Sequence, residues 1–349
     1  MRSATLLTAV TLTATGCSPG ANELFRSGVE AQLAGKDGVA RAAYKRALRR
    51  TTRIPGIENN LALLDMKRAA WAEADALLLR ELDRNPDLAD AAANRVLLQL
   101  LEGDPNDARA LAAKATAAFP KRALVHFAAG LAWRGGDDTK AAASFAEAIA
   151  HGKRTMKARA AFQLGLLEAG RGKHDAAAQA FTTVTKHRRD AIAFYNLALV
   201  QTRAGKLDDA LAALKSGSAL DPEAALIPAL EAHVQARSGQ VDAAFDAIKR
   251  AKKLDPTLLG LDALRGELLV QRRAPREAVD AFRAEATHTI EGKNPFAKDS
   301  WFALGLLAVE LSDYAEARKA FTAAAELDPK DTEAVRNRDV LAKMTEGAL

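Results

Sequence analysis

The chain has little of what most packed cores and catalytic centres depend on. Only one of its 349 residues is cysteine, which excludes an intramolecular disulfide. Aromatic residues make up 5% of the sequence although 49% is hydrophobic, and bulky rings normally supply much of a globular core. The 50 basic and 44 acidic residues are interspersed, and no aromatics accompany the short basic clusters. These absences argue against a disulfide scaffold and against a nucleic-acid-binding surface.

Motifs for metal binding, phosphate binding and nucleophilic catalysis are also missing. The six histidines are scattered, with no His-Glu-x-x-His pair and no second cysteine to complete a zinc site. The sequence has no Gly-x-Ser-x-Gly elbow and no phosphate-cradling glycine loop. We therefore expect no catalytic residue, no cofactor and no metal.

Alanine takes the place of the missing large residues. Abundant alanine, leucine, arginine, lysine and glutamate, with few β-branched residues, favour helix nearly throughout. Helices this rich in alanine bury little area each, so many shallow contacts between neighbours have to stabilise them. Such an arrangement is typical of repeat proteins, in which each unit contacts the next.

The segment from Trp301 to Pro329 shows the repeating unit most clearly. Apolar residues recur at helical spacing on both sides of Ser312-Asp313, and Asp328-Pro329 ends the second run. This pattern predicts a helix hairpin. Its diagnostic positions are occupied by Trp301, Leu304, Gly305, Ala317, Phe321, Ala324 and Pro329. In these residues the segment resembles the tetratricopeptide repeat (TPR) family.

The same pattern recurs about every 34 residues between residues 21 and 343, which is the TPR period. The position where two helices would cross is occupied in turn by Gly28, Ala62, Val96, Gly130, Gly165, Ala198, Ala232, Gly266 and Gly305. The resemblance implies an all-α fold, an α-α superhelical solenoid of about nine TPR helix hairpins with a C-terminal capping helix. In that cap we expect Val335, Val340 and Leu341 to pack inward and leave a polar outer face.

The register divides the chain into successive parts. Because small residues precede Cys17 in a pattern that resembles a bacterial lipobox, we expect residues 1–16 to be a signal peptide of the lipoprotein type and 17–20 to be a lipidated tether. Repeats one to eight occupy 21–290, repeat nine occupies 298–331, and the capping helix and tail occupy 332–349. The linker 291–297, with Gly292-Lys293-Asn294-Pro295, is longer than a normal repeat junction and is the predicted hinge.

The amino terminus is interpreted as a targeting signal with a lipidation site. Its apolar run is too short to span a bilayer, and small residues precede Cys17, an arrangement that resembles a bacterial lipobox, although Ala14 stands where leucine is usual. The resemblance implies acylation of Cys17 and, with Ser18 next to it, an outer-membrane location facing the periplasm if the host is Gram-negative. The alternatives are an ordinary signal peptide or a cysteine there by chance.

A partner groove is predicted from the resemblance. In TPR solenoids the first helix of each repeat lines the concave face, and here the corresponding positions are mostly apolar rather than the lysine and asparagine of a carboxylate clamp. The predicted groove residues are Phe127, Leu131, Phe162, Leu166, Tyr195, Leu199, Phe302 and Leu306. The alternative is that these side chains pack against the next repeat and are unavailable.

The expected function is that of a non-enzymatic adaptor. Such a protein would bind a protein or peptide partner in its groove and a membrane through the lipid on Cys17, with no nucleic acid and no metal. Lipoproteins of this build resemble pilotins of secretin and pilus assembly and adaptors of cell-wall complexes. Two alternatives stay open, an enzyme or enzyme subunit that acts on envelope glycans or peptides, and a cytoplasmic TPR regulatory protein.

Overall fold

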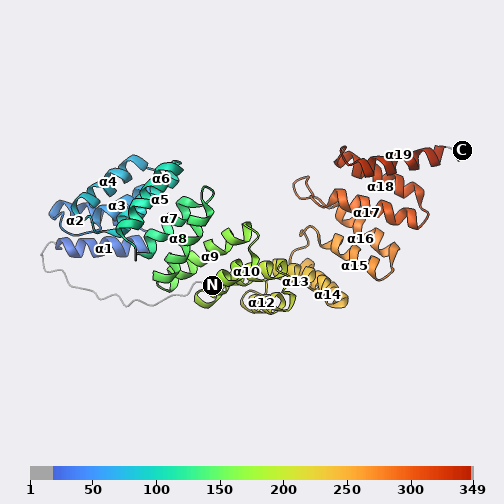
Figure 1. Ribbon diagram of the computed structural model, residues 1–349, viewed down its shortest axis with the longest axis horizontal. Helices are drawn as coiled ribbons and strands as arrows, with labels where there is room; N and C mark the ends of the chain where they lie inside the picture. Colours follow the sequence, from blue (N-terminus) through green and yellow to red (C-terminus); the bar gives the residue numbers. More distant parts are fainter. Residues whose placement is uncertain (1–18, 347–349) are drawn as a thin grey trace. The chain divides into compact units, whose positions relative to one another are not determined.

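A computed structural model of the chain describes residues 19–346 as antiparallel helix pairs (Figure 1). These residues form nineteen helices and no strand, so the predicted all-α fold is confirmed. The first ten are α1 (Ala21–Leu33), α2 (Asp37–Arg50), α3 (Ile57–Lys67), α4 (Trp71–Arg84), α5 (Ala89–Glu102), α6 (Pro105–Ala118), α7 (Ala123–Trp133), α8 (Asp138–His151), α9 (Arg154–Gly170) and α10 (His174–His187). The others are α11 (Ala191–Arg203), α12 (Leu207–Leu220), α13 (Leu226–Arg237), α14 (Val241–Leu254), α15 (Leu261–Gln271), α16 (Pro275–Thr287), α17 (Ala297–Glu310), α18 (Tyr314–Leu327) and α19 (Thr332–Glu346).

The helices pair as the repeat pattern predicts. Helices α1 to α18 make nine consecutive hairpins, and α19 follows as the capping helix. The chain forms two compact units, of which unit 1 ends at Ala160 and unit 2 begins at Ala161, within α9. Each unit has its own set of helix contacts and is described separately.

Small residues let the two helices of a hairpin approach each other closely. In unit 1, a Cβ atom placed on Gly28 would lie 2.5 Å from the ring of Tyr44. In unit 2, the equivalent atom on Gly305 would lie 2.8 Å from the ring of Phe321. Both distances are far below van der Waals contact, so the aromatic ring occupies the space that a side chain at the crossing would need. At these two crossings the small residue is therefore required by the packing.

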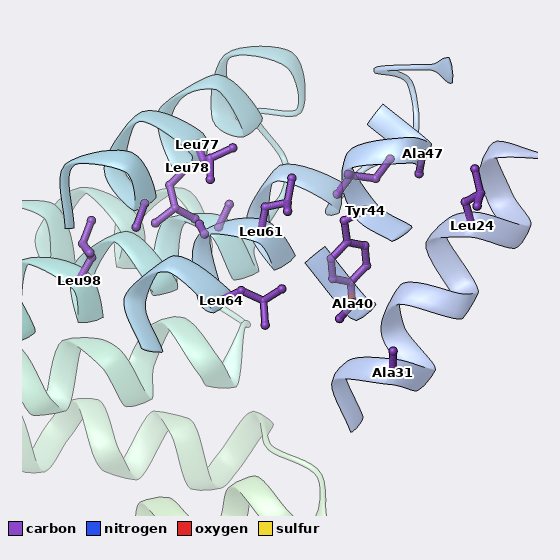
Figure 2. Close-up of a cluster of buried hydrophobic side chains, with 14 residues drawn as sticks. Leu24, Ala31, Ala40, Tyr44, Ala47, Leu61, Leu64, Leu77, Leu78 and Leu98 are labelled. Atoms are coloured by element: carbon purple, nitrogen blue, oxygen red, sulfur yellow. The ribbon is translucent and has the colours of Figure 1, made fainter. Parts of the chain in front are cut away.

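The first core of unit 1 shows how alanine and a few large residues share the interior (Figure 2). Tyr44 is fully buried between the leucines of neighbouring helices and the alanines of its own helix. Its hydroxyl donates to Oε1 of Gln32 at 2.7 Å and accepts from Nδ2 of Asn60 at 3.3 Å. The one polar atom of this ring thus has partners on two other segments, as a buried hydroxyl requires.

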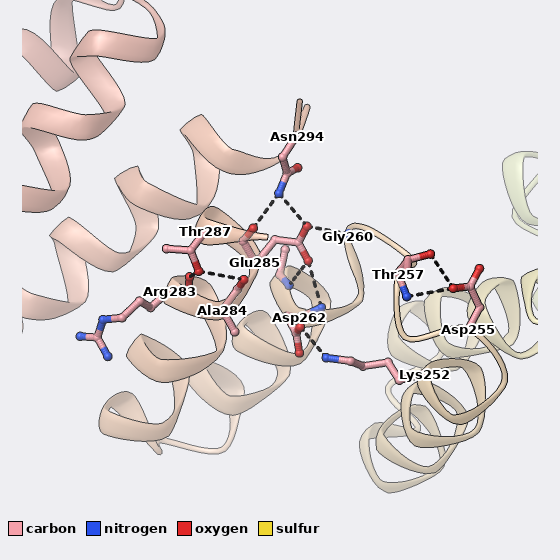
Figure 3. A network of polar contacts seen from close by, with 11 residues as sticks. Lys252, Asp255, Thr257, Gly260, Asp262, Arg283, Ala284, Glu285, Thr287 and Asn294 are labelled. Atoms are coloured by element: carbon pink, nitrogen blue, oxygen red, sulfur yellow. Dashed lines mark hydrogen bonds and ion pairs between the residues drawn. The ribbon is translucent and has the colours of Figure 1, made fainter. Parts of the chain in front are cut away.

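Two buried carboxylates cap helices from a neighbouring helix. Glu81 of α4 accepts from the backbone N–H groups of Gly56, Glu58 and Asn59 at the start of α3. Glu285 of α16 accepts in the same way from Gly260, Asp262 and Ala263 at the start of α15, as Figure 3 shows. A helix N-terminus leaves such donors unpaired and favours negative charge, so each carboxylate satisfies the backbone and fixes one helix pair.

The linker before the ninth repeat is tied down by hydrogen bonds. Ile290 and Lys293 exchange two backbone hydrogen bonds of 2.9 Å around a turn in which Glu291 and Gly292 have positive φ. The side-chain amide of Asn294 donates to the backbone carbonyls of Glu285 and His288, at 2.6 and 2.8 Å (Figure 3). The hinge stays a prediction, and these are the bonds that motion about it would have to break.

Candidate binding groove

In unit 1, the predicted groove residues Phe127 and Leu131 lie on α7. Phe127 is only 5% exposed, and its ring packs against that of Phe145 on α8 with the centroids 6.0 Å apart. The guanidinium of Arg159 lies over the same ring at 5.0 Å. Leu131 is partly buried. Phe127 therefore supports the hairpin and has no free face for a partner.

In unit 2, four predicted groove residues lie on the first helices of two repeats, Phe162 and Leu166 on α9, and Tyr195 and Leu199 on α11. All four are partly buried. Phe162 packs edge-on against Phe181 at 5.8 Å, and burial raises the pKa of the Tyr195 hydroxyl. The guanidinium of Arg188 lies over the Phe162 ring at 6.0 Å, so both a neighbouring ring and a cation contact this side chain.

The remaining pair, Phe302 and Leu306, lies on α17. Phe302 packs edge-on against Phe321 at 5.4 Å, whereas Leu306 is 50% exposed. Leu306 borders a hollow of about 370 Å³ between α17, α18 and α19, which we name the C-terminal groove. Its lining residues are Leu306, Val309, Tyr314, Phe321, Asn337, Val340, Leu341 and Met344.

The far wall of the C-terminal groove is α19, which is held by its first turn. Asp331 accepts from the backbone N–H groups of Glu333 and Ala334 at 3.1 Å and pairs with Lys298 at 3.2 Å. The N–H of Ala334 is the largest cause that lowers the pKa of the Asp331 carboxyl. Leu341 is buried as predicted, but Val340 is 48% exposed. The cap therefore does not turn a wholly polar face outward.

The sequence interpretation missed much of this groove. Val309, Tyr314 and Met344 were not predicted, although Val309 lies one helical turn after Leu306 on the same face. Val340 follows Leu306 by 34 residues, one repeat period, so it occupies the corresponding position on the capping helix. Counting one further repeat period from Leu306 into the capping helix would have predicted Val340 as a groove residue.

The described residues contain no cluster of metal-binding side chains. Between residues 19 and 346, no cluster of three or more histidine, cysteine, aspartate or glutamate side chains could hold a metal ion. The rings of His126 and His151 come within 6.4 Å, but His126 bonds the carbonyl of Pro120 and His151 pairs with Glu147. Cys17 lies outside the described residues. No helix within 19–346 is both long and apolar enough to cross a membrane.

Known proteins share the fold of this chain at low sequence identity. No curated protein matches it. The structure of Naa15/Naa10 bound to HypK-THB aligns at 18% identity and a TM-score of 0.50, covering 79% of this chain and 43% of that one. Yeast Tom70 aligns at 13% identity and a TM-score of 0.43, covering 94% and 96%. The family model described as "Tetratricopeptide repeat" matches residues 95–161, 162–225 and 264–332, more than half of the sequence. The chain belongs to the tetratricopeptide repeat family.

Proposed function

We propose that this TPR protein is a binding scaffold that captures an apolar segment of a protein partner in its C-terminal groove. The observation that carries the proposal is the exposure of Leu306, Val309, Tyr314, Val340 and Met344 around one hollow. Contiguous exposed apolar surface is costly in water and marks an interaction site on a protein. Binding, rather than catalysis, is the role that these side chains suit.

The chemistry of the groove sets the kind of partner. Asn337 is its only side chain with an amide, and Tyr314 adds one hydroxyl, so specificity for charge is weak and apolar contact dominates. A volume of about 370 Å³ lies in the range of pockets that hold a few anchoring groups. An amphipathic helix or strand that inserts two or three apolar side chains fits this shape.

The membrane part of the proposal rests on the amino terminus. Acylation of Cys17 would hold the scaffold at an envelope membrane, and attachment is stable when more than one acyl chain is present. The proposed role is then to keep a partner near that membrane during assembly of an envelope machine, such as a pilus and secretin system or a cell-wall complex. For a Gram-negative host we propose the outer membrane, facing the periplasm.

Site-specific photocrosslinking in the native host tests the groove. A photoreactive residue at Leu306 should give a discrete protein adduct, and one at Leu254, which is similarly exposed at the end of α14, should not. Adding Val309→Glu should abolish the adduct, because a charge would be desolvated in the groove. Equal adducts at both positions, or an adduct that survives Val309→Glu in a folded chain, would overturn the groove proposal.

Acyl labelling with cell fractionation tests the anchor separately. The wild-type chain should incorporate labelled fatty acid and sediment with membranes, and Cys17→Ala should do neither. An unlabelled wild-type chain in the cytoplasmic fraction would contradict the envelope proposal and favour a cytoplasmic regulatory protein.

A further inference from the structure

The net charge of the chain is concentrated in its first hairpin. Residues 19–53 contain eight basic and three acidic side chains, a formal charge of +5, whereas the whole chain carries +6. Residues 54–349 contain 41 basic and 41 acidic side chains and are formally neutral. The interspersed charges expected from composition therefore describe the later repeats but not the first.

The cations of this hairpin gather on the outward face of α2. Helical spacing places its core residues, Ala40, Ala43, Tyr44 and Ala47, on one side, and all four are buried. Lys45, Arg46 and Arg49 point away from this side over the last two turns, and Arg50 lies at the edge of the buried side where the helix ends. All four are exposed. Within residues 19–346, no carboxylate forms an ion pair with any of them, so we name these four side chains the α2 basic face.

The basic face lies at the end of the hairpin where the described chain begins. Nη1 of Arg50 donates to the backbone carbonyl of Pro19, which joins the C-terminal end of α2 to the segment before α1. Pro19 is two residues after Cys17. A tether of two residues spans at most about 7 Å even when it is fully extended. A group attached to Cys17 therefore stays close to the cations.

We propose that the α2 basic face lies on the phosphate headgroups of an anionic phospholipid bilayer, beside the acyl anchor on Cys17. The inference rests on the proposed function for the position of the anchor, but the charges can bind without it. Anionic leaflets attract clustered lysine and arginine, and guanidinium groups fit phosphate oxygens in two-point contacts. Nucleic acid is disfavoured, because Tyr44, the only aromatic residue of α2, is buried and cannot stack on a base.

Docking in this way would orient the first repeats of unit 1. The buried face of α2 packs against α1 and α3, so these contacts would point away from the headgroups. A lipid and a polybasic face together form the two-signal attachment that a single acyl chain needs for stable binding. The basic face would thus hold the hairpin in one orientation, whereas the anchor alone allows it to rotate.

Vesicle binding with matched charge variants tests the inference. The full 349-residue chain carrying Cys17→Ser would be mixed with vesicles of phosphatidylcholine alone or with about one third phosphatidylglycerol. In that background we compare Lys45→Gln/Arg46→Gln/Arg49→Gln with Lys215→Gln/Lys249→Gln/Lys253→Gln. Both triples remove three exposed cations without a carboxylate partner, from α2 in the first case and from α12 and α14 in the second. Arg50 is kept because it bonds Pro19.

The α2 triple should lower the preference for phosphatidylglycerol vesicles about 100-fold, since each cation near such a surface contributes about fivefold. The control triple should change it less than threefold. Raising the salt concentration from about 0.05 to about 0.5 M should weaken wild-type binding, because screening shortens the range of the attraction. Retained helical circular dichroism shows that a loss does not come from unfolding.

Three results would overturn the inference. Equal losses in the two triples would show attraction by net charge alone, and equal binding to both vesicle types would show no preference for anionic lipid. Complete displacement of the vesicles by an equal concentration of oligonucleotide phosphate would favour nucleic acid instead. The assay uses a chain that cannot be acylated at position 17. A failure of acyl labelling in the wild type therefore leaves its outcome standing, and the two proposals fail separately.

Discussion

The two units are built alike inside and differ outside. The terminal hairpin of each uses the same crossing, with Gly28 under Tyr44 in unit 1 and Gly305 under Phe321 in unit 2. The exposed surface beside the first crossing is cationic, and the surface beside the second is apolar. The repeat constrains the residues where helices touch and leaves the outward positions free to vary, so binding chemistry can change from one repeat to another.

The two units also share a buried carboxylate that caps a helix. Glu81 and Glu285 lie 204 residues apart, which is six repeat periods of about 34 residues, and each caps the first helix of its own hairpin. Each capped helix starts after a glycine of positive φ, Gly56 or Gly260. Both units therefore use the same buried-charge device, and mutations can test whether its strength is also the same.

The largest expected effect comes from removing the crossing aromatics. Phe321→Ala should destabilise the end of unit 2 by about 3–5 kcal/mol, because it leaves a cavity over Gly305. Tyr44→Ala should cost unit 1 at least as much, since it also breaks the bond to Gln32. Urea unfolding with hydrogen exchange measures both, and each loss should concentrate in its own hairpin. A uniform loss of protection over both units would contradict the proposed likeness of the two ends.

The carboxylate caps should give the next largest effect. Glu81→Ala and Glu285→Ala should each cost about 2–3 kcal/mol, because the backbone N–H donors of α3 or α15 would stay buried without an acceptor. Chemical denaturation checks this against Glu73→Ala on α4, where the side chain is exposed and the change should be within about 0.5 kcal/mol. If either cap variant matched that control, the two units would not share this device.

The crossing glycines should have a smaller effect of the same kind. Gly28→Ala and Gly305→Ala should each cost about 1–3 kcal/mol, since the added methyl group collides with Tyr44 or Phe321. Gly38→Ala is the matched control in α2, because no atom lies within 4 Å of its added Cβ, and alanine should stabilise that helix by up to about 1 kcal/mol. Thermal unfolding midpoints that move in the same direction for all three would refute the packing argument.

The smallest expected effect is a loss of α19 stability at acidic pH, which would occur in unit 2. The pKa of the Asp331 carboxyl is lowered by the N–H of Ala334, so its stabilisation of α19 is present at neutral pH. That stabilisation should be lost as the pH falls below about 4 and through the lower folded pKa. Fluorescence of Trp301, in a chain with Trp71→Phe and Trp133→Phe, should report this loosening. Asp331→Asn should make the signal independent of pH over this range, and an unchanged titration would contradict the assignment.

The prediction of the fold succeeded where the evidence was local and repeated. A break at Ser312-Asp313 and a stop at Asp328-Pro329 place α17 and α18 correctly within a few residues. Counting back by 34 residues recovers nine hairpins and the cap because stacked repeats must keep one spacing. The groove residues were harder to predict than the fold. The position of a residue within a repeat does not show how much of its side chain a neighbouring helix covers. Phe127 is covered by Phe145 and Arg159, whereas Leu306 is open.

The sequence by itself determined the family, the helix pairs and the crossing residues, because each follows from the periodic spacing of residues. It also determined the position of the one cysteine. Only the tertiary structure decided which apolar residues are open to a partner and that Arg50 joins the basic face to Pro19, just before α1. It also decided that carboxylates far along the sequence cap particular helices. The physical reason is that exposure and capping depend on what the neighbouring helix places beside a residue, and that neighbour is chosen by packing in three dimensions.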